Sequence, residues 1–505
     1  MVMKKFLPTI LLTTAMMLLF SSCGPDNKTL EAMVPKSSET VVCFKVPQLV
    51  EKSGLFSGDD IVLPDSLKQL LRQNDEAFVS RAVKALPQLG VMIKNNIYVF
   101  APKSKLNLAT VLSVESADKA VAALEHMNGA KFEEADGLRF LIADTGVVYA
   151  INDNVLCAGW LANGVSGDDG LNEIKGYFSQ KGNSIADDAD ILKSLQREGD
   201  VVGYACLKNV SRFTEGVPGS IGTEISSIMT EMVGALKDVK AEFAVTFNGS
   251  KADMVATISG GKAVEAVKSV LSKPSNAVLR TIPNTMASIL SVSVSGEQLL
   301  KLPSVSGLVA MAKAFSFTSN LDLEQLIGEI EGPIVMGIAP DSYFSNDYNY
   351  AFAVGSRNPH DLMNKVGEFA TMMGQEPDVV GPEHIYGLYN KQVKVGVEGN
   401  SVYAKMLNYE QTEGNADEIA PAMELLGKYP LALFQNSRLG YFTLGFDNNL
   451  EGTGCYAAKD ENANAIAQLL MLACSIKPQP KPKEEKSDDV EYAPMPTAID
   501  QLTEF

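Results

Sequence analysis

The segment Phe243-Ala-Val-Thr-Phe-Asn-Gly249 returns in similar form as Phe442-Thr-Leu-Gly-Phe-Asp-Asn448, 199 positions further along the chain. Apolar residues alternate with small or polar ones in both segments, which predicts a β-strand. The Asn-Gly and Asp-Asn pairs predict a tight turn into a second strand. A helix closes each stretch, and its apolar face carries Val267, Val270 and Leu271 in the first and Ile466, Leu469 and Leu470 in the second.

Two similar segments also open the stretches that end in this way, at Val34-Pro35 and at Ile282-Pro283, 248 positions apart. An alternating strand follows each, through Val42, Phe44 and Val46 in the first copy and through Leu290, Val292 and Val294 in the second. Because the offset falls from 248 to 199, the second copy is shorter by about 49 residues. This order of matching segments predicts a tandem duplication.

Each copy also contains a strand that leads into a capped helix. The first helix follows Ser116 and the second begins at Asn358-Pro359, and their expected apolar faces are Ala120, Val121, Leu124 and Met127 and then Leu362, Val366 and Phe369. We predict an α+β fold in which each copy is a mainly antiparallel sheet with helices packed on one face. Repeat A covers residues 33–275 and repeat B residues 276–475. The sequence leaves open whether the repeats are separate domains or share a joined sheet.

The N-terminus has the order of a bacterial export signal, with Lys4 and Lys5 before the apolar run Phe6–Phe20. This run has 15 residues, fewer than the roughly 20 that a membrane-spanning helix needs. Ser-Ser-Cys-Gly around Cys23 resembles the lipobox of bacterial lipoproteins. That resemblance implies a signal peptide over residues 1–22, a lipid on Cys23 and a lipidated tether over residues 23–32. Gly24 in place of Asp implies the outer membrane, with the periplasmic and surface-facing orientations both open.

Composition and charge narrow the class of protein and of partner. Apolar residues make up 46% of the chain and charged residues 21%, which predicts a packed core. The formal net charge of −18 becomes −20 once Lys4 and Lys5 leave with the signal. Such a chain repels phosphate backbones, so no nucleic-acid partner is expected. After Cys474 the chain becomes rich in proline, lysine and acidic residues, and residues 476–505 are expected to form a flexible tail.

No familiar catalytic or metal-binding motif is present in the sequence. The three histidines, His126, His360 and His384, lack metal-site spacing, and there is no Gly-x-Ser-x-Gly motif. Acid clusters such as Asp168-Asp169 and Asp187-Asp188 lack the calcium-loop spacing and are expected to be solvated. Beyond Cys23, the remaining cysteines, Cys43, Cys157, Cys206, Cys455 and Cys474, are expected to be buried free thiols, and a disulfide in an oxidising envelope is the alternative. We predict no catalytic residue, no metal and no cofactor.

One segment of repeat B is a candidate ligand-binding loop. Aromatic rings there alternate with amide and carboxylate groups, which can stack on sugar rings and bind their hydroxyls, and the candidate residues are Tyr343, Phe344, Asn346, Asp347, Tyr348 and Tyr350. An ordinary hairpin with tyrosines packed on the sheet is the alternative.

The Val34-Pro35 segment, the Ser-Ser-Cys-Gly anchor and the repeated Ile282-Pro283 segment together resemble a family of Bacteroidetes lipoproteins built on a domain of unknown function. The resemblance implies a place in the cell envelope and supplies no catalytic residues. We predict a membrane-anchored, non-catalytic binding or scaffolding module with a protein or glycan partner in the envelope. The alternatives are a hydrolase with an unrecognised active site and a periplasmic carrier of an apolar ligand.

Overall fold

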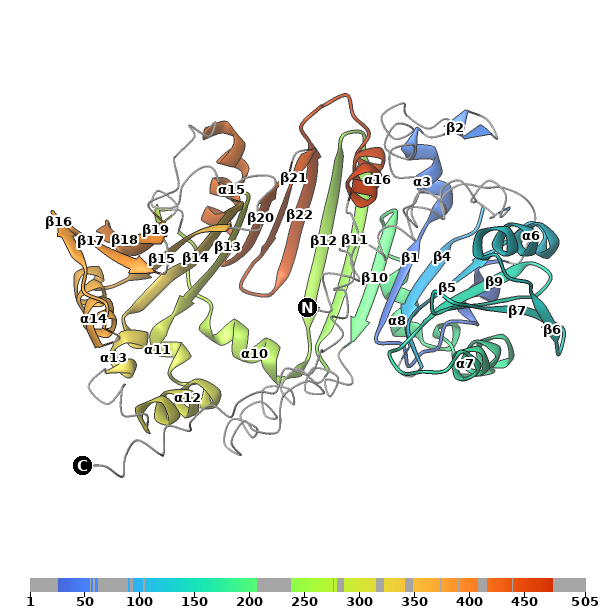
Figure 1. Cartoon of the computed structure of the whole chain (residues 1–505), viewed down its shortest axis with the longest axis horizontal. Coiled ribbons are helices and arrows are strands. Elements are labelled where there is room, and N and C mark those ends of the chain that lie inside the picture. The colour runs from blue at the N-terminus through green and yellow to red at the C-terminus, as the bar shows by residue number, and fades with distance from the viewer. Residues whose placement is uncertain are drawn as a thin grey trace, which may run out of the picture.

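The computed structural model describes residues 26–54, 56–57, 60–61, 90, 94–102, 105–206, 238–275, 277–278, 286–314, 322–340, 348–372, 374–388, 391–406, 416–437 and 439–475. Within these ranges, twenty strands form one sheet in which all pairings are antiparallel (Figure 1). Two short strands, β2 (Phe56–Ser57) and β3 (Asp60–Ile61), pair separately. The fold is therefore α+β, as predicted.

The described residues up to 278, here called the first half, contribute ten neighbouring strands. From the outer edge inward they are β6 (Glu133–Ala135), β7 (Leu138–Ala143), β8 (Val147–Ile151), β9 (Val155–Leu161), β5 (Leu106–Ser113), β4 (Ile97–Ala101), β1 (Thr40–Phe44), β10 (Val201–Cys206), β11 (Lys240–Asn248) and β12 (Lys251–Ser259).

The described residues from 286 onward, here called the second half, contribute the other ten strands. From the middle outward they are β22 (Glu451–Ala458), β21 (Gly440–Phe446), β20 (Leu431–Asn436), β13 (Ser288–Ser295), β14 (Ile330–Pro340), β15 (Tyr348–Ser356), β19 (Ser401–Met406), β18 (Lys391–Glu398), β17 (Glu383–Leu388) and β16 (Asp378–Val380). If the strands are numbered from one to ten along the chain within each half, strands with the same number have the same neighbours in both halves. The order across the sheet is mirrored about the β12–β22 pair. The innermost strands, β12 and β22, pair from Lys251↔Ala457 to Thr257↔Glu451, so the two halves share one sheet.

Helices cover both faces of the sheet, which corrects the prediction of helices on one face. In the first half, β4 places Ile97 and Val99 in one core cluster and Tyr98 and Phe100 in another, so both of its faces need cover. The Ile97 side, here the α16 face, lies under α3 (Val46–Ser53), α6 (Ala117–Asn128) and α16 (Ala465–Ser475). The Tyr98 side lies under α2 (Asn27–Glu31), α7 (Gly167–Ser179), η1 (Ile185–Asp187) and α8 (Ala189–Leu195).

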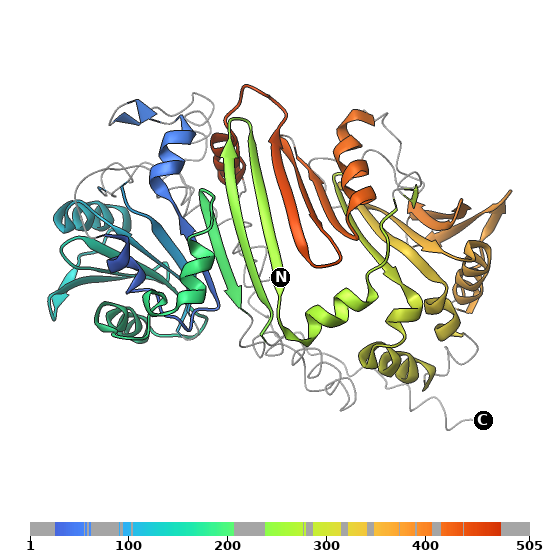
Figure 2. The ribbon, with the colours of Figure 1, turned by 180° about the vertical axis from the view of Figure 1, so that it is seen from behind.

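The two faces can be followed into the second half, because residues paired across neighbouring strands lie on the same side of the sheet. The Tyr98 side continues to Ala432 and Ala353, which pack under α15 (Ala416–Lys428), and is here called the α15 face. Figure 2 looks onto this face, and Figure 1 looks onto the α16 face. At the far end of the α16 face, α14 (Pro359–Met372) packs over the strands through Leu362 and Met363. Val366 and Phe369, which we expected on the packed side of α14, are instead 37% and 39% exposed.

The closing helix of each half crosses the boundary and contacts the other half. Helix α16 packs on α3 and inserts Ile466 and Leu470 into the core of the first half. In return α10 (Gly261–Val270) contacts α11 (Gly296–Leu299) of the second half, and Leu271 bridges to Val294 of β13. Helices α12 (Pro303–Ala314) and α13 (Leu323–Gly328) follow α11. The halves are therefore joined by an exchange of helices as well as by the sheet.

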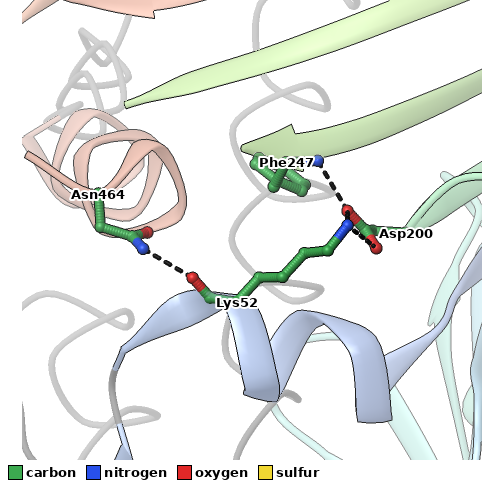
Figure 3. A network of polar contacts seen from close by, with 4 residues as sticks. All are labelled: Lys52, Asp200, Phe247 and Asn464. Carbon is green, nitrogen blue, oxygen red and sulfur yellow. Dashed lines mark hydrogen bonds and ion pairs between the residues drawn. The ribbon is translucent and has the colours of Figure 1, made fainter. Parts of the chain in front are cut away.

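A buried carboxylate holds this junction together (Figure 3). Asp200, whose side chain is 1% exposed, lies 2.8 Å from Lys52 Nζ of α3 and accepts the Phe247 N–H of β11 at 2.7 Å. The Asn464 side chain, at the start of α16, donates to the Lys52 carbonyl oxygen at 2.7 Å. The network thus connects α3, the β10–β11 region and the closing helix of the second half.

Two boundaries differ from the predictions. Residues 27–31 of the expected tether form α2, where Leu30 is fully buried, because Leu30, Met33 and Val34 fill the core under the α15 face. Val46, expected in a strand, begins α3, where Pro47 occupies the first turn. The signal peptide, Cys23 and the tail over residues 476–505 lie outside the described residues.

Candidate functional site

The predicted aromatic loop is only partly within the described residues. Tyr343, Phe344, Asn346 and Asp347 lie outside them, and Tyr348 is described only as the first residue of β15. Tyr350 is 36% exposed, and its ring stacks on that of Phe352, with centroids 6.5 Å apart and planes 16° apart. Tyr350, at the described end of the predicted loop, therefore forms an exposed pair of aromatic rings with Phe352.

This ring pair belongs to a larger surface on the α16 face. Phe352 lies opposite Met336 of β14, which lies opposite Leu290 of β13. Leu290 in turn lies opposite Leu433 of β20. Side chains paired in this way point to the same side of a sheet. We call this surface the open apolar face and define it by Leu290, Met336, Ile338, Tyr350, Phe352 and Leu433.

The exposure of this surface is unusual for a sheet interior. Leu290 is 42% exposed and Phe352 is 44% exposed, while Met336, Ile338 and Leu433 are partly covered. The opposite side of the same strands is closed, since Ala351 and Ala353 are fully buried in the core cluster that also contains Leu425 and Leu426 of α15. Contiguous exposed apolar side chains on a protein surface are typical of interaction sites.

The sequence predicted strand β13 but not which of its two sides is exposed. The alternation through Leu290, Val292 and Val294 is confirmed as β13, yet the closed side carries Ile289, Ser291 and Ser293, each at most 2% exposed. A sequence signal does exist in β15, where Tyr350, Phe352 and Val354 alternate with alanine and glycine. The small residues Ala351 and Ala353 lie in the core cluster that also contains residues of α15, and the large residues point to the other face.

A polar cluster around Glu383 has a structural arrangement. Glu383 of β17 accepts Lys394 Nζ and the Tyr403 hydroxyl, each at 2.6 Å. The hydrogen bond from Lys394, and then that from Tyr403, lower the pKa of Glu383. Burial raises the pKa of the Tyr403 hydroxyl. Glu383 is therefore held as a carboxylate with both oxygens engaged, which is unlike a general acid.

The predicted acid clusters lie at helix starts. Asp188 accepts the backbone N–H groups of Asp190 and Ile191 and begins α8, and Asp169 bonds the Ser166 hydroxyl at the start of α7. Asp187 closes a capping box with Ser184. Of the described residues, no three His, Cys, Asp or Glu side chains are grouped so that they could hold a metal ion.

The described thiols are expected to resist alkylation. Cys43, Cys157 and Cys206 are buried and free, as predicted, and Cys455 is free and half-buried. Burial raises the pKa of Cys43 to about 12 and that of Cys455 to about 11. At pH 8 roughly one Cys43 in ten thousand is then a thiolate. Iodoacetamide followed by mass spectrometry should leave Cys43 and Cys157 unmodified in the native protein and modify both in urea. Rapid native labelling of Cys157 would contradict this.

Comparison with known proteins adds little to this site. The sequence matches no protein-family model, and no curated protein matches it. Among solved structures it is similar to crystal form III of TP0453, at 12% identity and a TM-score of 0.28 over 48% of this chain and 81% of that one. Crystal form I of TP0453 matches at 9% identity and a TM-score of 0.21 over 76% and 92%. No helix in the described ranges is both long and apolar enough to cross a membrane.

Proposed function

We propose that this chain is a lipid-anchored protein of the bacterial outer membrane that binds a protein partner through the open apolar face. The exposure of Leu290, Tyr350 and Phe352 on one side of the sheet carries the proposal. Apart from the Tyr350 hydroxyl, these side chains and those of Met336 and Ile338 carry no hydrogen-bonding group for sugar hydroxyls, which favours a protein with an apolar surface over a glycan. The activity is binding or scaffolding, without a chemical step.

The proposed anchor is the lipid on Cys23, and the proposed history is a tandem duplication. The body begins close behind the anchor, because α2 starts at Asn27 and Leu30 is fully buried. The mirrored strand order of the two halves supports the duplication, since two unrelated ten-strand units would have no reason to share it. Two copies joined edge to edge also account for the exchange of α16 and α10.

Replacing Cys23 with serine tests the anchor. We expect the variant to leave the membrane fraction and to appear in the soluble envelope fraction, because a chain without acyl groups loses its membrane attachment. Cys43→Ser is the matched control and should stay in the membrane fraction. Retention of the Cys23→Ser chain in membranes after a high-salt wash would contradict the lipid anchor.

Photo-crosslinking tests the binding surface. A benzophenone side chain at Phe352 is expected to yield a discrete protein adduct in intact cells, and Leu290→Lys should weaken that adduct about tenfold because a charge then replaces a contact at the centre of the surface. The control position is Val255 of β12, which is 52% exposed on the opposite face and should give no such adduct. Adducts with lipid alone would support the apolar-ligand carrier instead. Equal protein adducts from both positions would overturn the proposal.

A further inference from the structure

The two outer edges of the sheet differ in chemistry. β6 ends the first half and carries Glu133 and Glu134, both exposed. β16 ends the second half and carries Val379 and Val380, which are 64% and 56% exposed. In the described part of the chain each of these strands pairs on one side only. Charged residues on an edge strand oppose association with another sheet. β16 keeps an acid, Asp378, in the place of Glu133, but has Val379 in the place of Glu134 and Val380 in the place of Ala135.

Helix α14, which packs on β15, β18 and β19 in the same outer part of the sheet, adds further exposed apolar side chains. On α14, Val366, Phe369 and Met372 are 37%, 39% and 42% exposed and recur at a spacing of three, so they form one stripe. Their side of the sheet is also that of Val379. Val379 pairs with His384, and His384 bonds the Tyr386 hydroxyl next to Gly367 of α14. Helix α6, in the matching position of the first half, buries Ala120, Ala123 and Leu124.

We propose that a second copy of this chain adds to the sheet at β16, with the two β16 strands antiparallel about a two-fold axis perpendicular to the sheet. An unpaired strand edge is recognised only by another extended strand, because its free N–H and C=O groups need a ladder partner. This axis keeps the faces of the sheet in register, so the second copy's α14 lies on the same face as the first. The stripes of both helices then flank the seam, where a short extended peptide would leave them uncovered.

The geometry within the chain favours the same contact. The halves already meet through antiparallel pairing of their matching strands β12 and β22, with a mirrored order of strands on either side. Pairing centred on Val379 places Asp378 opposite Val380, so no two acids face each other. The glutamates of β6 then stop growth at the other end, which predicts a closed dimer and no filament.

The test uses the full-length lipidated chain, purified in detergent, with its mass measured by light scattering over a range of concentrations. We expect the wild type to be a dimer and Val379→Lys to raise the dissociation constant at least about tenfold, because an ammonium group then sits in the seam. Val255→Lys changes a valine in the middle of the sheet that is 52% exposed, against 64% for Val379, and this variant should remain a dimer. Unchanged thermal unfolding of both variants shows that each is folded.

Cross-linking in the native envelope identifies the molecule that pairs with β16. With a short bis-maleimide, Val379→Cys should give a covalent dimer of this chain, and Val255→Cys should not. A wild-type monomer at every concentration, or a Val379→Lys dimer as stable as the wild type, would overturn the proposal. A Val379→Cys adduct with a different protein would assign the edge to that protein, and a ladder of higher oligomers would rule out the closed dimer.

Discussion

An Asp200→Ala substitution is expected to lower the free energy of unfolding by about 2–4 kcal/mol. The carboxylate is 1% exposed and accepts Lys52 Nζ twice and the Phe247 N–H, and Gln48 can donate to it at 3.1 Å. Its removal leaves the buried N–H of Phe247 without a partner. The Lys52 side chain is 35% exposed and can turn to water, which keeps the loss below that of a fully buried ion pair.

Urea unfolding followed by circular dichroism measures this loss. The matched control is Asp118→Ala, which removes an acid that is 87% exposed and paired with Arg139. Its cost should be under about 1 kcal/mol, because exposed ion pairs contribute little. If the two variants lose the same stability, the buried network around Asp200 does not stabilise the junction.

A Gly296→Ala substitution is expected to destabilise the protein by about 2–3 kcal/mol. Gly296 begins α11, and a β-carbon there would overlap the Ile327 carbonyl oxygen at the end of α13 and lie 3.0 Å from the Ile330 carbonyl oxygen. These are backbone atoms, so the clash cannot be relieved by turning a side chain. Relief of the overlap requires that α11 or the end of α13 move.

Gly307→Ala provides a control of opposite sign. Gly307 lies inside α12, and nothing is within 4 Å of where its β-carbon would be. Alanine restricts the unfolded chain and favours the helix, so a gain of about 0.5–1 kcal/mol is expected. Thermal unfolding of both variants should therefore move in opposite directions. A neutral Gly296→Ala would show that α11 can move away from α13 at little cost.

Local patterns in the sequence predicted much of the fold. The Asn248-Gly249 turn, the strands β11 and β21, and the helix that follows Ser116 are confirmed. These features are readable because a hairpin or a cap is decided by residues close together in the chain. The sharing of one sheet was not readable, because it depends on Lys251 meeting Ala457, two residues far apart in sequence.

The candidate site was only partly readable for a related reason. Tyr350 was predicted as part of a loop, yet it lies in β15. It belongs to the same exposed surface as Leu290, which is distant in sequence and lies on β13, two strands away across β14. The exposed side of β13 could not be inferred, because Leu290 and Ile289 are both apolar and only tertiary packing, which places Ile289 in the core cluster with α15, decides which one is buried. The polar junction was missed, since Asp200 and Lys52 belong to no motif.

The β12–β22 pairing has a consequence for the order of folding during synthesis. The chain is synthesised from its N-terminus, so β11 and β12 are complete well before β22 has been made. Until nearly the whole chain has been synthesised, β12 is an unpaired sheet edge, and α3 lacks the contact with α16. Unpaired edges of this kind promote aggregation in folding intermediates. Synthesis of the last strands thus becomes the step that allows the protein to reach its native state, and a chain truncated before β22 should depend strongly on chaperones.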